Sequence, residues 1–122
     1  MDRKRLLGLL LVLCAAGAGY AWAGDRDMAK AFVDSAEALM KQNLYDKASD
    51  MCQRAIREDE SFALAYYQLA VCQQKLGRAR EAIATFEKCE TLAQQAGDAD
   101  LARRAREEAD KVSPGLRLLT QA

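Results

Sequence analysis

The sequence predicts an all-α fold: a short α-solenoid of two helix-turn-helix units followed by a C-terminal capping helix. Glycine occurs after residue 24 only at positions 77, 97 and 115, and the 122-residue chain contains one proline. The remaining residues are rich in Ala, Leu, Glu, Lys, Arg and Gln, which favour helices. The chain also resembles itself, because the segment from Ala29 aligns with the segment from Ala63, and apolar positions recur at helical spacing within each segment.

This alignment brings aromatic residues opposite aromatic ones and small residues opposite small ones. The aligned pairs include Phe32 with Tyr66, Ala36 with Ala70, Ala48 with Ala82, and Ala55 with Cys89. A polar turn divides each unit into two helices, at Asn43-Leu44 and at Gly77-Arg78. Small residues are needed where two antiparallel helices pack closely, so we expect these alanines to be buried at the helix contacts.

This pattern resembles the tetratricopeptide repeat family, whose unit is a helix-turn-helix of about 34 residues. The resemblance implies a repeat domain over residues 24–112, with repeats at about 29–62 and 63–96 and a capping helix at 98–112. Gly97-Asp98 is expected to stop one helix and cap the next. Ser113-Pro114-Gly115 is expected to end the capping helix, so that residues 113–122 form a C-terminal tail.

Residues 1–23 have the order of a secretory signal peptide. A basic start precedes an apolar run from Leu6 to Ala16, and Ala21-Trp22-Ala23 fits an A-x-A cleavage site. Cleavage would export the domain, to the periplasm if the source is a Gram-negative bacterium, and would leave no membrane segment. The alternative is an uncleaved segment from Leu6 to Ala23, which is just long enough to anchor the chain in a membrane.

Composition argues against several functional classes. The 18 Lys and Arg residues balance 18 Asp and Glu residues, so there is no electrostatic reason to expect a nucleic-acid partner. Histidine, the commonest proton shuttle and metal ligand, is absent from the sequence. Adjacent carboxylates such as Glu107 and Glu108 are typical of a solvated helix face. We therefore expect a protein that is not an enzyme and that needs no cofactor or metal.

Cys52, Cys72 and Cys89 each occupy a position that the repeat can bury, where a free cysteine packs as a small apolar residue. The alternative is a disulfide, because an exported protein meets oxidising conditions. Cys72 lies about 200° around the helix from Ala70. If Ala70 faces the helix that carries Cys89, Cys72 faces the preceding unit, where Cys52 lies. The candidate pair is therefore Cys52–Cys72.

The resemblance also implies a binding surface, because the concave face formed by the first helix of each unit is the usual partner site of the family. Carried over position by position, that face would present Val33, Glu37, Met40 and Lys41 from the first unit and Leu64, Tyr67, Val71, Gln74 and Lys75 from the second. Its apolar members would suit a partner's helix or extended peptide. Alternatively, they are ordinary half-exposed helix residues.

The function that we expect is a non-catalytic protein-protein interaction module of the cell envelope, which docks a partner peptide or helix on this face. The alternative is a structural subunit that forms a homo-oligomer through the open repeat flank or the C-terminal tail. Two repeats are fewer than a stable solenoid usually needs, which is the reason for keeping this alternative.

Overall fold

The computed structural model describes the backbone of residues 26–121 and the side chains up to residue 114. The predicted signal peptide at residues 1–23 and the side chains of the predicted tail from residue 115 lie outside the described part. The described residues form five helices and no strand. These are the helix at residues 26–41 (helix 26–41), α2 (Tyr45–Glu58), α3 (Ala63–Lys75), α4 (Ala79–Gln95) and α5 (Ala99–Gln121). The prediction of an all-α fold is confirmed.

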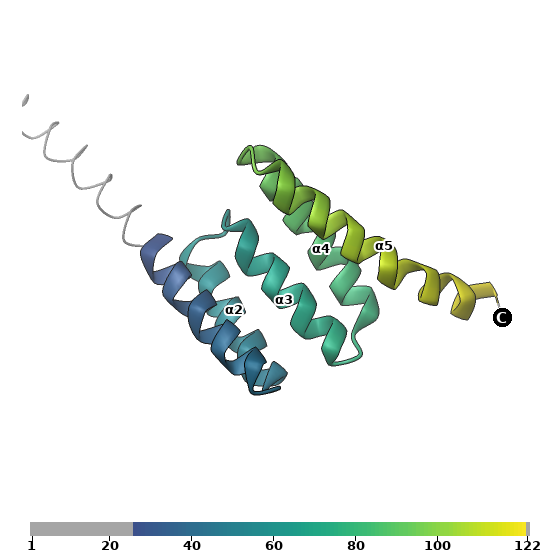
Figure 1. Ribbon diagram of the computed structural model, residues 1–122, viewed down its shortest axis with the longest axis horizontal. Helices are drawn as coiled ribbons and strands as arrows, with labels where there is room; N and C mark the ends of the chain where they lie inside the picture. Colours follow the sequence, from purple (N-terminus) through teal and green to yellow (C-terminus); the bar gives the residue numbers. More distant parts are fainter. Residues whose placement is uncertain (1–25, 122) are drawn as a thin grey trace, which may run out of the picture.

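The helices form two antiparallel pairs and one further helix, placed side by side in two layers (Figure 1). Helix 26–41 pairs with α2, and α3 pairs with α4, while α5 packs on α4 and also touches α3. In the view of Figure 1, helix 26–41, α3 and α5 lie in front of α2 and α4. This order is that of a short α-solenoid, in which each unit contacts only its neighbours. Across residues 26–121, no helix is long and apolar enough to cross a membrane.

Three of the connections use the same helix-ending geometry. Asn43, Gly77 and Gly97 have positive φ angles of 62°, 79° and 77°. A residue in this left-handed region lets the chain leave the helix and satisfies otherwise unpaired carbonyls. At Gly77, the next backbone N–H, that of Arg78, donates to the carbonyl of Gln73 at 2.8 Å. The turns predicted at Asn43-Leu44 and Gly77-Arg78 are therefore confirmed.

Asp98 caps the last helix, as its position after Gly97 predicted. Its Oδ1 accepts a hydrogen bond from the backbone N–H of Leu101 at 3.0 Å, which is the usual action of an N-cap carboxylate. The chain therefore reverses between α4 and α5 within the short connection at residues 96–98. This sharp reversal places α5 directly against α4.

Small side chains occupy the helix contacts. Alanines 36, 48, 55, 70 and 82 are all completely buried, as the repeat alignment predicted. The largest fully buried side chain is Phe86 on α4, which packs among the alanines of α3, α4 and α5. Because alanine lets helix axes approach closely, the alanines bring the helices together around Phe86, and the larger side chains of Leu92, Leu101 and Tyr67 pack in the same core.

The expected end of the capping helix near Val112 is wrong, because α5 continues to Gln121 with Pro114 inside it. A proline in a helix removes one hydrogen bond, here the bond to the carbonyl of Asp110. Asp110 and Pro114 are both exposed, so water can satisfy this carbonyl. In Figure 1 the C-terminal part of α5 extends beyond the other helices. The helix therefore passes the proline at a place where no packing has to be broken.

Candidate functional site

The front layer of helices carries a row of half-buried apolar side chains on α3. Leu64, Tyr67 and Val71 lie one turn apart, and all three pack from outside against the core that surrounds Phe86. Residues three or four apart share one face of a helix, so the three side chains form a continuous strip. Each is only partly covered, and the strip therefore has one side in the core and one side available for contact.

Tyr67 is held in place by two neighbours. Its ring meets the ring of Phe86 edge-on, with centroids 5.6 Å apart and an interplanar angle of 69°. The guanidinium of Arg104 on α5 lies over the same ring, 5.1 Å from the centroid. Edge-to-face rings and a cation over a ring face are both favourable arrangements. The orientation of Tyr67 is therefore fixed before any partner arrives.

The strip opens at Leu64 onto a hollow of about 290 Å³. The hollow lies where helix 26–41, α3 and α5 begin, and its lining combines apolar and charged side chains of all three. These residues are Arg26, Ser61, Phe62, Ala63, Leu64, Ala96, Asp98, Asp100, Leu101 and Arg104. The two arginines balance the two aspartates, so the hollow offers an apolar floor with charges of both signs at its rim.

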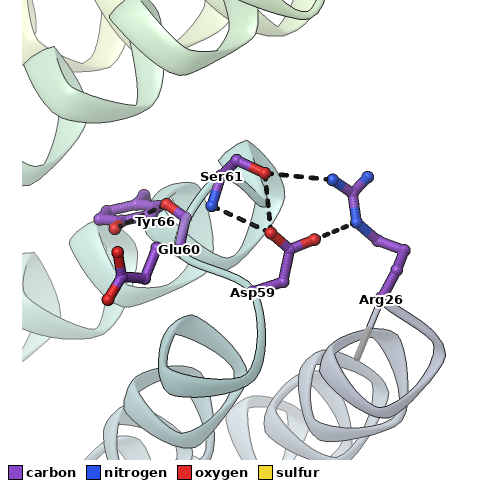
Figure 2. A network of polar contacts seen from close by, with 5 residues as sticks. All are labelled: Arg26, Asp59, Glu60, Ser61 and Tyr66. Atoms are coloured by element: carbon purple, nitrogen blue, oxygen red, sulfur yellow. Dashed lines mark hydrogen bonds and ion pairs between the residues drawn. The ribbon is translucent and has the colours of Figure 1, made fainter. Parts of the chain in front are cut away.

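A polar network holds one wall of this hollow (Figure 2). Arg26 forms an ion pair with Asp59, and its guanidinium also lies 5.0 Å from the centre of the Phe62 ring. The Asp59 carboxylate accepts hydrogen bonds from the backbone N–H of Ser61 at 3.0 Å and from its hydroxyl at 2.7 Å. Tyr66 donates its hydroxyl to the carbonyl of Glu60 at 3.0 Å. Together these contacts fix the loop between α2 and α3 against the start of helix 26–41.

Replacing Asp59 by asparagine is expected to lower the free energy of unfolding at neutral pH by about 1 kcal/mol. Burial alone would raise the pKa of Asp59, but hydrogen bonds from Ser61 and the ion pair with Arg26 outweigh it and hold the pKa below its ordinary value. Such a carboxylate stabilises the fold above its unfolded-state pKa of about 3.9, and this contribution is lost as the pH falls through the lower folded-state pKa.

The stability difference between wild type and Asp59→Asn should therefore be largest above about pH 5 and shrink toward about pH 2 in urea unfolding series. The exposed Asp50→Asn is the matched control, with a change of less than about 0.5 kcal/mol at every pH. A difference for Asp59→Asn that stays constant over this pH range would contradict the role of the ion pair.

Residues 63–96, which contain the strip, the turn at Gly77 and the whole of α4, match the tetratricopeptide repeat family model. Residues 63–96 therefore form a tetratricopeptide repeat. The matched residues have the same limits as the second repeat expected from the sequence. Tetratricopeptide repeats stack into superhelices with extended binding surfaces, and domains of this type generally mediate protein-protein interactions.

The crystal structure of a tetratricopeptide repeat domain protein from Salinibacter ruber has the same fold as this repeat protein. The two superpose with a TM-score of 0.66 over 70% of this chain and 96% of the other, at 17% sequence identity. No curated protein matches the sequence. The likeness therefore establishes the solenoid fold of the repeats.

The residues that the family resemblance places on the predicted binding face differ in their exposure. Leu64, Tyr67 and Val71 form the strip described above. Lys41, Gln74 and Lys75 are exposed, whereas Glu37 and Met40 are half-buried between the repeats. Glu37 Oε1 accepts a hydrogen bond from Gln68 Nε2 at 2.9 Å, and this bond links helix 26–41 to α3.

Val33 is a correction to the predicted face. Its side chain is only 2% exposed and packs in a buried cluster with Ala29, Ala55, Phe62 and Ala65. Phe62 is the N-cap residue of α3 and Ala65 lies in the first turn of that helix, so the start of α3 covers Val33 as the two repeats stack. Val33 therefore stabilises the contact between the repeats and offers no surface to a partner.

The sequence did not predict that α5 contributes to the candidate face beside the strip. Arg104 lies over Tyr67, and Leu101 lines the hollow beside it. The sequence predicted this helix only as a cap. The signal that could have found these residues is the position of α5 directly after a complete repeat, where it takes the place of the first helix of a third unit.

The three cysteines of the described part are free, buried thiols, so the expectation that they are buried is confirmed. Burial raises the pKa of Cys89 to about 11. The neighbouring Cys72 thiol and burial raise the pKa of Cys52, and the neighbouring Cys52 thiol lowers the pKa of Cys72. Between residues 26 and 121, no group of three or more His, Cys, Asp or Glu side chains is placed to hold a metal ion.

Proposed function

We propose that this repeat protein docks a segment of a partner protein on the face formed by helix 26–41, α3 and α5. The observation that carries the proposal is the fixed, half-exposed strip of Leu64, Tyr67 and Val71 that opens onto the hollow of about 290 Å³. Apolar side chains beside a hollow with charges of both signs suit a helix or extended peptide that carries apolar anchors and polar flanks. A pre-positioned aromatic ring also reduces the ordering cost of binding.

The outward side of α5 favours this proposal over self-association through the repeat flank. Its exposed side chains include Arg103, Arg106, Glu107 and Asp110, and Arg103 pairs with Asp100 and Glu107. A terminal helix with a polar outer face is how repeat arrays end in water. Within residues 99–114 this flank therefore offers no apolar patch to a second copy.

We place the protein in the cell envelope on the basis of the signal-like segment at residues 1–23, with periplasmic export as the first alternative and an uncleaved membrane anchor as the second. Expression with a C-terminal tag, followed by fractionation and mass measurement of the tagged protein, separates the two. Cleavage after Ala23 gives a soluble chain that begins at Gly24. An intact N-terminus in the membrane fraction indicates the anchor.

The docking proposal is tested by affinity capture from envelope extract of the source organism, followed by titration of the recovered partner with purified variants. Tyr67→Ala combined with Val71→Ala removes the strip, and we expect at least a tenfold loss of affinity. Because Tyr67 also packs on Phe86, circular dichroism must show that the variant remains folded at the assay temperature. A second variant, Lys75→Glu, changes an exposed residue on the same helix.

The matched control is Ile83→Ala, which shortens a half-exposed apolar side chain on α4, in the back layer. We expect this control to bind as the wild type does. If the partner binds the folded Tyr67→Ala/Val71→Ala variant with unchanged affinity, the assignment of the face is wrong. Multi-angle light scattering of the wild type tests self-association, and a stable dimer at micromolar concentration would favour the alternative function.

A further inference from the structure

We infer that Cys52 and Cys72 form a disulfide that ties the first repeat to the second. Cys52 lies on α2, the second helix of the first repeat, and Cys72 lies on α3, the first helix of the second repeat. These two helices pack directly on each other. The inference concerns the covalent state of the chain, so it stands whatever partner the binding face takes.

The two cysteines meet in one buried cluster, whose other members are Ala36, Ala48 and Leu69. Neither side chain is exposed, and the two thiols are close enough for each to shift the pKa of the other. A disulfide requires two cysteines whose side chains already approach across a close helix contact, since Cα atoms more than about 7 Å apart cannot be bridged without backbone movement. The small neighbours Ala36 and Ala48 keep this contact close.

The third described cysteine belongs elsewhere. Cys89 lies on α4 in the cluster around Phe86 and Leu92, which is separate from the cluster of Cys52 and Cys72. The α2–α3 contact thus brings two of the three described thiols together and leaves the third apart. The pairing is therefore selected by how the repeats stack.

The two thiols take different roles in forming the bond. The neighbouring Cys52 thiol lowers the pKa of Cys72, so the Cys72 thiolate is the nucleophile. It attacks one sulfur of an external disulfide, here oxidised glutathione, expels one glutathione thiolate and forms a mixed disulfide. Cys52 then releases its proton to solvent and attacks the sulfur of Cys72, which expels the second glutathione. Two protein thiols are oxidised, and one external disulfide is reduced to two thiols.

Burial decides when this reaction can take place. Solvent does not reach either sulfur in the folded chain, so the exchange requires folding or a local opening of α2 from α3. Once formed, the same burial protects the bond from reductants. The signal peptide predicted at residues 1–23 would bring the chain to an oxidising compartment, where such bonds persist.

The test refolds the reduced full-length chain in a glutathione redox buffer, blocks the remaining thiols with N-ethylmaleimide and digests with trypsin. Each cysteine then falls in its own peptide: residues 6–26 for Cys14, 48–54 for Cys52, 58–75 for Cys72 and 89–103 for Cys89. The expected product is peptide 48–54 linked to peptide 58–75, with Cys89 blocked. Blocked thiols at both Cys52 and Cys72, or predominant links to Cys14 or Cys89, would overturn the inference.

Thermal melting provides a second measurement that needs no peptide mapping. The oxidised chain is expected to melt on the order of 10 °C above the reduced chain, because the bond closes the loop from residue 52 to residue 72 in the unfolded state. Cys89→Ala should keep this shift and Cys52→Ala should lose it. A shift of the same size in Cys52→Ala would contradict the pairing.

Discussion

Replacement of Phe86 by alanine is expected to lower the free energy of unfolding by about 3–5 kcal/mol. Phe86 is completely buried and is the largest fully buried side chain of a core that also contains alanines of α3, α4 and α5, Cys89, Leu92 and Leu101. Helices held this closely by small residues cannot collapse into the space that the ring leaves, so the cost includes a cavity as well as lost transfer energy. The variant also removes the edge-on contact with Tyr67.

Urea unfolding followed by circular dichroism measures this effect, and Phe86→Leu is the matched control because it keeps most of the apolar volume. We expect the leucine variant to lose clearly less stability than the alanine variant. Small domains have a total stability of about 5–15 kcal/mol, so Phe86→Ala removes a large share of it. A loss below about 1 kcal/mol would show that the second repeat does not depend on this ring.

Replacement of Ala70 by leucine tests the opposite side of the same packing argument. Ala70 is completely buried on α3 and shares its cluster with Ala82 and Phe86 of α4. A leucine there must push the helices apart or adopt a strained rotamer, and we expect a loss of about 1–3 kcal/mol in the free energy of unfolding.

Ala84→Leu provides the control for Ala70→Leu, because it makes the same chemical change at an exposed position of α4. The control should stay within about 0.5 kcal/mol of the wild type in the same urea series. If the two leucine variants unfold alike, close packing of α3 on α4 is not what stabilises the repeat.

The periodic features of this protein were readable from the chain because each depends on a few neighbouring residues. A polar turn with Asn43 or Gly77 allows a positive φ at the end of a helix, whichever helices pack around it. Alanines that recur at helical spacing mark the side of a helix that another backbone approaches. The helix-turn-helix units, their turns and the buried alanines were therefore predictable.

Val33 and Tyr67 show where prediction from neighbouring residues along the chain fails. They occupy equivalent positions in the first helices of the two repeats. Val33 is covered by Phe62, the N-cap residue of α3, and by Ala65, whereas Tyr67 stays half-exposed with the guanidinium of Arg104 over its ring. Helical periodicity gives the direction in which a side chain points, but the neighbouring unit decides whether anything covers it.

The proposed binding face also depends on how the units stack. Leu64, Tyr67 and Val71 follow from helical spacing, yet the hollow beside them exists only because Arg26, Ser61 and Arg104 come together from three parts of the chain. The run of α5 through Pro114 was also not predictable from the sequence alone. The helix is exposed at this proline and loses only one hydrogen bond there.

Local rules of spacing, turn chemistry and residue size thus specify the repeat, the turns and the packed alanines of this protein. Burial of Val33, exposure of Tyr67, the approach of Cys52 to Cys72 and the shape of the proposed binding face depend on how the units stack. Stacking depends on contacts between residues that are far apart along the chain. The spacing of residues within one helix does not specify these contacts.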